Sequence, residues 1–105
     1  MKSYRVLIMP TAKKSLLEIG EYIALDNPVR AISFIDEISD SLIKTLSIFP
    51  YSGKVAEDLD LGEEIRVVPY GNYVSYYRVL EDNLVVEVLF IFNASRNIQA
   101  LITRL

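Results

Sequence analysis

Apolar and polar positions alternate most regularly in the second half of the chain. β-Branched and aromatic residues concentrate in three stretches, residues 64–68, 73–80 and 84–92, which turn-forming residues separate at 69–72 and 82–83. Stretches of this composition between tight turns favour antiparallel strands. The pattern therefore predicts a meander of three strands, and a further short strand at residues 4–9, before Pro10.

The first half carries a helical period instead. Ala12, Leu16, Ile19 and Ile23 recur at spacings of four, three and four, which predicts a helix with Thr11 as its cap. Asn27 and Pro28 are a favourable cap and first residue for a second helix, which ends before Pro50. Its predicted buried stripe is Ala31, Ile35, Ile38, Leu42, Leu46 and Phe49.

These elements predict an α+β fold in the order β-α-α-β-β-β, with an N-terminal helical hairpin packed on an antiparallel sheet meander. With 105 residues and 51% apolar content, residues 1–105 are expected to form a single domain. The short apolar run after Met1 is too brief for a signal sequence or a membrane span, so we expect a cytoplasmic protein that does not enter a membrane.

Composition excludes several kinds of chemistry. The sequence has no cysteine and no histidine, which removes thiolate nucleophiles, the commonest general base and the commonest metal ligand. We therefore expect no metal and no cofactor, and the chain reads as a binding protein rather than an enzyme. A net charge of −3 argues against strong direct binding to nucleic acid.

The register of the meander decides which side chains meet. A two-residue turn at 82–83 places Arg78 opposite Glu87 and Tyr76 opposite Leu89, and a three-residue loop at 70–72 places Arg66 opposite Tyr76. These residues would then share one surface, while the other face, including Phe90 and Phe92, would receive the helices.

Two interpretations of that surface stay open. Arg78 and Glu87 form a structural ion pair in one, while in the other the arginines and Tyr76 recognise a peptide or an acidic partner. Arg96 is either a surface charge or a further member of the site.

Taken together, the order and spacing of short motifs resemble the RelE/ParE toxin superfamily of bacterial type II toxin–antitoxin systems. The resemblance covers nearly the whole chain and rests on Tyr4-Arg5-Val6, Pro10-Thr11-Ala12, Leu16-Leu17-Glu18-Ile19, Tyr22-Ile23-Ala24, Asn27-Pro28, Ala31, Phe34, Phe49-Pro50, Gly53, Ile65-Arg66, Tyr76-Tyr77-Arg78-Val79, Val88-Leu89 and Arg96. The predicted meander contains no lysine, and Asn93 stands where ParE-like proteins often carry a histidine. The chain is more similar to the ParE branch than to the RelE branch.

The resemblance implies a growth-inhibiting toxin of the kind linked to plasmid stabilization, with DNA gyrase as its target and a cognate antitoxin that wraps around it. Arg66, Tyr76, Arg78 and Arg96 are the candidate target-binding residues, and the same four are the candidates if the protein is catalytic. We expect the antitoxin to contact apolar residues that lie beside the helical stripes, namely Leu17, Tyr22, Ile32 and Phe34.

Two alternative activities stay open. RelE-like members cut messenger RNA on the ribosome, and Arg66, Tyr76 and Arg78 on one face would suit that activity. A degenerate, non-toxic binding module is the other.

Overall fold

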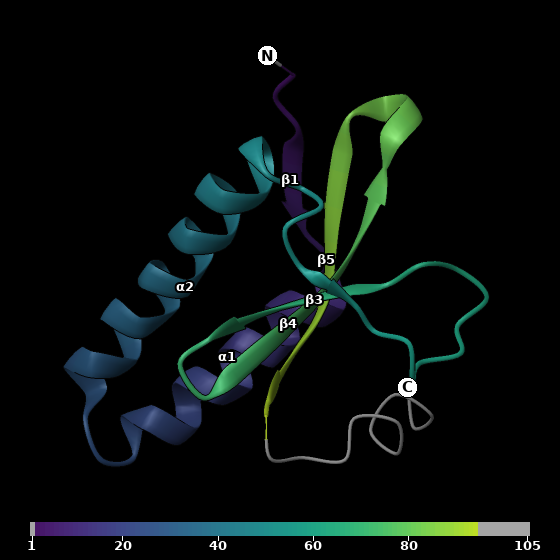
Figure 1. The fold of residues 1–105 in the computed structure, drawn as a ribbon. Helices are drawn as coiled ribbons and strands as arrows, with labels where there is room; N and C mark the ends of the chain where they lie inside the picture. Colours follow the sequence, from purple (N-terminus) through teal and green to yellow (C-terminus); the bar gives the residue numbers. More distant parts are fainter. Residues whose placement is uncertain (1, 95–105) are drawn as a thin grey trace.

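The computed structural model describes residues 2–94, which form two helices and one five-stranded sheet (Figure 1). In chain order the elements are β1 (Arg5–Ile8), α1 (Pro10–Ala24), α2 (Pro28–Ile48), β2 (Lys54–Val55), β3 (Arg66–Tyr70), β4 (Tyr73–Leu80), a short 3-10 turn (Glu81–Asn83) and β5 (Val85–Asn93). The predicted α+β fold with an N-terminal helical hairpin on an antiparallel meander is confirmed.

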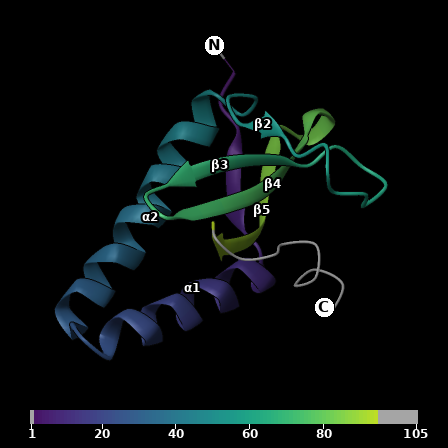
Figure 2. The same ribbon diagram turned by 60° about the horizontal axis from the view of Figure 1, so that its bottom comes forward.

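The sheet has the strand order β1-β5-β4-β3-β2. β1 is parallel to β5, and every other neighbouring pair is antiparallel. Helix α1 packs against α2 and against β5, and α2 also packs against β1. In Figure 2 the two helices meet at the hairpin tip and diverge toward the sheet. β2 was not predicted, because two residues are too few for an alternating pattern to show.

The helix boundaries follow proline and asparagine. Pro10 occupies the first turn of α1, so the helix starts before Thr11, and the Thr11 hydroxyl donates instead to the carbonyl of Leu89 in β5. The predicted cap by Thr11 is therefore wrong. For α2 the prediction is confirmed, since the Asn27 side chain accepts a hydrogen bond of 3.0 Å from the backbone N–H of Arg30.

The main core lies between the helices and one face of the sheet. Its buried residues are Tyr4, Ala12, Leu16, Phe34, Ile38, Leu42, Leu46, Tyr77, Val86, Val88 and Ile91. The α2 stripe differs from the prediction at both ends. Phe34 is buried against the rings of Tyr70 and Tyr73, while Phe49 is exposed, because it follows the last helical turn and leaves the helical period.

The register of β4 and β5 combines one confirmed pair with a shift. Arg78 lies opposite Glu87 as predicted, but a β-bulge gives β5 one extra residue, so Tyr76 lies opposite Phe90 instead of Leu89. A bulge of this kind moves the residues beyond it to the other side of the sheet. Phe90 and Phe92 consequently lie with Tyr76 on the side opposite the helices, which we call the far face, and not under the helices as predicted.

The β3–β4 turn causes a second shift. Tyr70 pairs with Tyr73, which leaves a loop of two residues in which Gly71 has a φ of 58°. Arg66 then lies opposite Tyr77 rather than Tyr76. Because Tyr77 belongs to the main core, Arg66 is on the helix-facing side of the sheet.

The segment from Ala56 to Ile65, here called the 56–65 connection, joins β2 to β3 and projects away from α2 (Figure 1). Its buried residues Ala56, Leu59 and Ile65 form a second small core with Tyr76 and Leu89. The connection therefore covers part of the far face.

Candidate functional site

The four candidate target-binding residues do not share one surface. Arg78 and Tyr76 lie on the far face, Arg66 lies on the helix-facing side, and Arg96 is outside the described residues. The prediction that Arg66 joins Tyr76, Arg78 and Glu87 is wrong, because the two-residue loop shifts β3 by one position and so turns Arg66 over.

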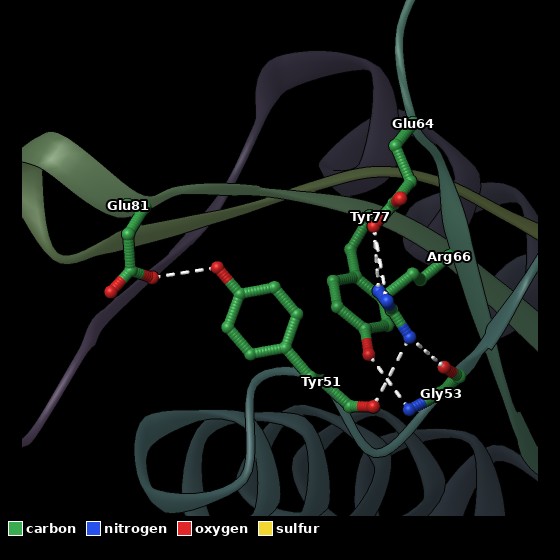
Figure 3. Close-up of polar contacts among 6 residues, drawn as sticks. All are labelled: Tyr51, Gly53, Glu64, Arg66, Tyr77 and Glu81. Carbon is green, nitrogen blue, oxygen red and sulfur yellow. Dashed lines mark hydrogen bonds and ion pairs between the residues drawn. The ribbon is translucent and has the colours of Figure 1, made fainter.

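Arg66 is bound by two backbone carbonyls, by the Tyr51 ring and by Glu64. Its Nη1 donates to the carbonyl oxygens of Tyr51 and Gly53, at 3.2 and 2.8 Å, and its guanidinium lies 5.1 Å from the centre of the Tyr51 ring (Figure 3). Nε donates to Glu64 at 3.0 Å. With these partners Arg66 holds the segment that joins α2 to β2 against the sheet.

Tyr77 fixes the same segment from inside the core. Its ring is fully buried, and its hydroxyl accepts a hydrogen bond of 2.9 Å from the backbone N–H of Gly53 (Figure 3). A Cβ at Gly53 would lie 2.6 Å from the Tyr77 hydroxyl and 2.7 Å from the carbonyl oxygen of Val67. Only glycine fits this approach without displacing backbone.

Glu81 ties the β4–β5 turn to two other segments. Its carboxylate accepts hydrogen bonds from the hydroxyls of Tyr51, at 2.6 Å, and of Tyr4, at 2.7 Å. The bond to Glu81 raises the pKa of Tyr51 to about 12, and the two phenols lower the pKa of Glu81. Tyr51 therefore stays protonated at neutral pH and is a poor base.

Arg78 is bound entirely by side chains. Its Nη1 donates to both carboxylate oxygens of Glu63, at 3.0 and 2.9 Å, and its Nε donates to Glu87 at 2.7 Å. These hydrogen bonds, first to Glu63 and then to Glu87, raise the pKa of Arg78. Glu63 was not among the predicted partners, because it belongs to an irregular segment whose path across the sheet no local pattern encodes.

Three aromatic rings lie on the far face along β4 and β5. Phe90 and Phe92 are stacked with centroids 5.8 Å apart, and Phe92 meets Tyr76 at 6.4 Å. Burial raises the pKa of Tyr76, as does the nearby negative charge of Asp58. In the part of the chain that the structure describes, the far face thus combines an arginine paired with two carboxylates and a group of aromatic rings.

The residues expected to contact an antitoxin divide into two groups. Leu17, Tyr22 and Ile32 are exposed, at 64%, 72% and 68%, on the helical hairpin, and Leu25 and Val29 near its tip are exposed as well. Phe34 is only 7% exposed and belongs to the main core. Phe34 therefore does not share the exposed surface of the other three residues, because α2 turns its side chain toward Tyr70 and Tyr73.

Within residues 2–94, no helix is long and apolar enough to cross a membrane. The same part of the chain holds no group of three or more acidic side chains placed to bind a metal ion.

Comparison with known families decides the classification. Residues 6–98 match the model of the ParE toxin of type II toxin–antitoxin systems, parDE. The chain belongs to this family. As a ParE-family toxin it is the toxin component of a type II toxin–antitoxin system, and no curated protein sequence matches it.

Solved structures agree with this family on the fold. One similar chain comes from the toxin–antitoxin complex RelBE2 of Mycobacterium tuberculosis, with a TM-score of 0.67 and 21% identity over 90% of this chain and 97% of that one. Another comes from the chromosomal ParDE system of P. aeruginosa, with a TM-score of 0.71 and 18% identity over 89% and 98%. At 21% and 18% identity, these two structures show only that this chain shares their fold.

Proposed function

We propose that this ParE-family toxin stops growth by binding DNA gyrase, and that a cognate antitoxin neutralises it in the cytoplasm. The observation that carries the proposal is the composition of the far face, where Arg78 lies between two carboxylates and Tyr76, Phe90 and Phe92 form an aromatic group along the same two strands. Arginine and aromatic side chains are the commonest anchors of protein–protein contacts.

The same face supports binding rather than RNA cleavage. Cutting RNA through its 2′-hydroxyl needs a group that takes up a proton near neutral pH. The sequence has no histidine, and burial raises the pKa of Tyr76. Arg78 is already neutralised by Glu63 and Glu87, so it is a weak site for the phosphates of messenger RNA.

A supercoiling assay with purified gyrase tests the target. We expect the toxin to inhibit supercoiling or to trap the cleavage complex, and neither effect at a molar excess of toxin would exclude gyrase. Primer extension on translated messenger RNA tests the alternative, since codon-linked cuts would identify a ribosome-dependent endoribonuclease. If induction leaves growth unchanged without antitoxin, the chain is a non-toxic binding module.

Support for an antitoxin contact comes from the helical hairpin. Leu17, Tyr22 and Ile32 leave apolar area in water, and an amphipathic or extended antitoxin segment that covers them would bury it. Tyr22→Asp is expected to weaken antitoxin binding while circular dichroism shows an unchanged fold. Phe34→Asp is the contrasting variant, because a charge in the main core should unfold the protein.

A further inference from the structure

The 56–65 connection is attached to the far face at two points. Ala56, Leu59 and Ile65 pack with Tyr76 and Leu89, and Glu63 makes the twofold contact with Arg78. The connection therefore covers apolar surface and occupies Arg78 at the same time.

The two carboxylates on Arg78 are held differently. Glu87 lies in β5 directly opposite Arg78, and its side chain is only 13% exposed, so the strand register fixes it. Glu63 lies in the connection, and its side chain is 42% exposed. Glu87 thus orients the guanidinium, whereas Glu63 occupies its outer edge and can rotate away without breaking strand pairing.

Glu63 binds Arg78 in the way an incoming carboxylate would. Both of its oxygens accept from Nη1, the guanidinium nitrogen that Glu87 does not contact, and a carboxylate of another protein can accept from the same nitrogen. Exchange of one carboxylate for another leaves the charge around Arg78 unchanged. The electrostatic cost of the exchange is therefore small compared with the cost of removing Glu63 alone.

We propose that Glu63 is an internal stand-in for an acidic side chain of the toxin's protein target, which displaces Glu63 from Arg78 and opens the 56–65 connection. Opening exposes Tyr76 and Leu89, so the matching segment carries one carboxylate among apolar residues. A nucleic acid fits less well, because Glu57, Asp58 and Asp60 of the same connection repel a chain of phosphates.

A peptide measurement tests this proposal without gyrase. The probe is a short peptide with one glutamate among leucines and serines, titrated into the full-length protein and followed by backbone amide NMR shifts. Glu63→Gln should tighten peptide binding about two- to fivefold, because the internal competitor is weakened and an exposed ion pair contributes little. Arg78→Ala should abolish binding, and a peptide with glutamine in place of glutamate should bind neither protein.

Glu64→Gln is the matched control. It removes the same charge from the neighbouring residue, but Glu64 pairs with Arg66, so peptide affinity should stay at the wild-type value. Equal affinity of the wild type and Glu63→Gln, or tightening by Glu64→Gln as well, would overturn the proposal. Displacement of the peptide by a single-stranded oligonucleotide would also overturn it and indicate a nucleic-acid site.

The proposal rests on the proposed function for the kind of protein that is bound. The two can fail separately. Gyrase that is not inhibited, together with the expected peptide result, would leave Glu63 as a stand-in for another protein target. Inhibited gyrase with no effect of Glu63→Gln on the peptide would contradict only the stand-in.

Discussion

Arg66 and Arg78 lie on the neighbouring strands β3 and β4, but they contact different kinds of partner. Arg66 donates to two backbone carbonyls, stacks on the Tyr51 ring and pairs with Glu64, and the two carbonyls can move only with the chain. Arg78 is bound only by carboxylate side chains, of which Glu87 is fixed by the strand register while Glu63 can rotate away. The type of partner, rather than the number of hydrogen bonds, therefore distinguishes the two residues. Arg66 supports the fold, and Arg78 is available for recognition.

Gly53→Ala should have the largest effect on the segment that Arg66 and Tyr77 hold against the sheet. The added methyl group meets the Tyr77 hydroxyl and the backbone of Val67, so the free energy of unfolding should fall by about 1–3 kcal/mol in urea denaturation. Ser47→Ala is the control, since it removes an exposed bond to the carbonyl of Lys44, away from Tyr77, and should cost much less. Equal losses from both variants would show that the close approach of Gly53 does not matter.

Arg66→Ala should have the next largest effect. It leaves the carbonyl of Gly53 without its donor and removes the stack on Tyr51, so we expect a loss of about 1–3 kcal/mol. Arg66→Lys should recover little of the loss, because an ammonium group cannot span both carbonyls and stack on the ring. If Arg66→Lys restored the full free energy of unfolding, the charge of Arg66 alone would account for its contribution.

Arg78→Ala should change stability less. Its contacts are partly exposed ion pairs, so removal should cost on the order of a few tenths to one kcal/mol. Salt should shrink the difference between wild type and variant, since exposed pairs are screened. A loss as large as that of Arg66→Ala, unaffected by salt, would erase the distinction between the two arginines.

The smallest effect at neutral pH concerns Tyr51. Because its folded pKa of about 12 exceeds the ordinary value of 10, this phenol contributes stability below pH 10, and the contribution disappears as pH rises toward 12. Glu81→Gln should bring the Tyr51 pKa back toward 10, so phenolate absorbance should appear at a lower pH than in the wild type. Tyr51→Phe should remove this part of the absorbance change. A pKa that stays near 12 in Glu81→Gln would show that Glu81 is not its cause.

The fold could be predicted from the sequence because every element except the two-residue β2 has a local signal. The helical period with Asn27 and Pro28 gave the hairpin, and the alternation in residues 73–80 gave β4 with its observed limits. The site depended on register, and a β-bulge has no composition of its own. One extra residue in β5 was enough to move Phe90 and Phe92 to the far face, and one residue fewer in the β3–β4 loop turned Arg66 to the other side.

Partners that come from irregular segments were out of reach for the same reason. Glu63 and Tyr51 meet their arginines only after the chain has closed around the sheet, and neither lies at a fixed spacing from its partner. Phe34 shows that a regular pattern can also mislead. Its position beside the helical stripe predicted exposure, but the rings of Tyr70 and Tyr73 bury it.

The most direct test of the account is growth arrest by Arg78→Ala, measured on the same protein whose unfolding is followed in urea. The account predicts that arrest disappears while the free energy of unfolding stays within about 1 kcal/mol of wild type, and that Glu87→Gln, which keeps the arginine, still arrests growth. Arrest that persists in Arg78→Ala would return Arg78 to a purely structural role and contradict the account.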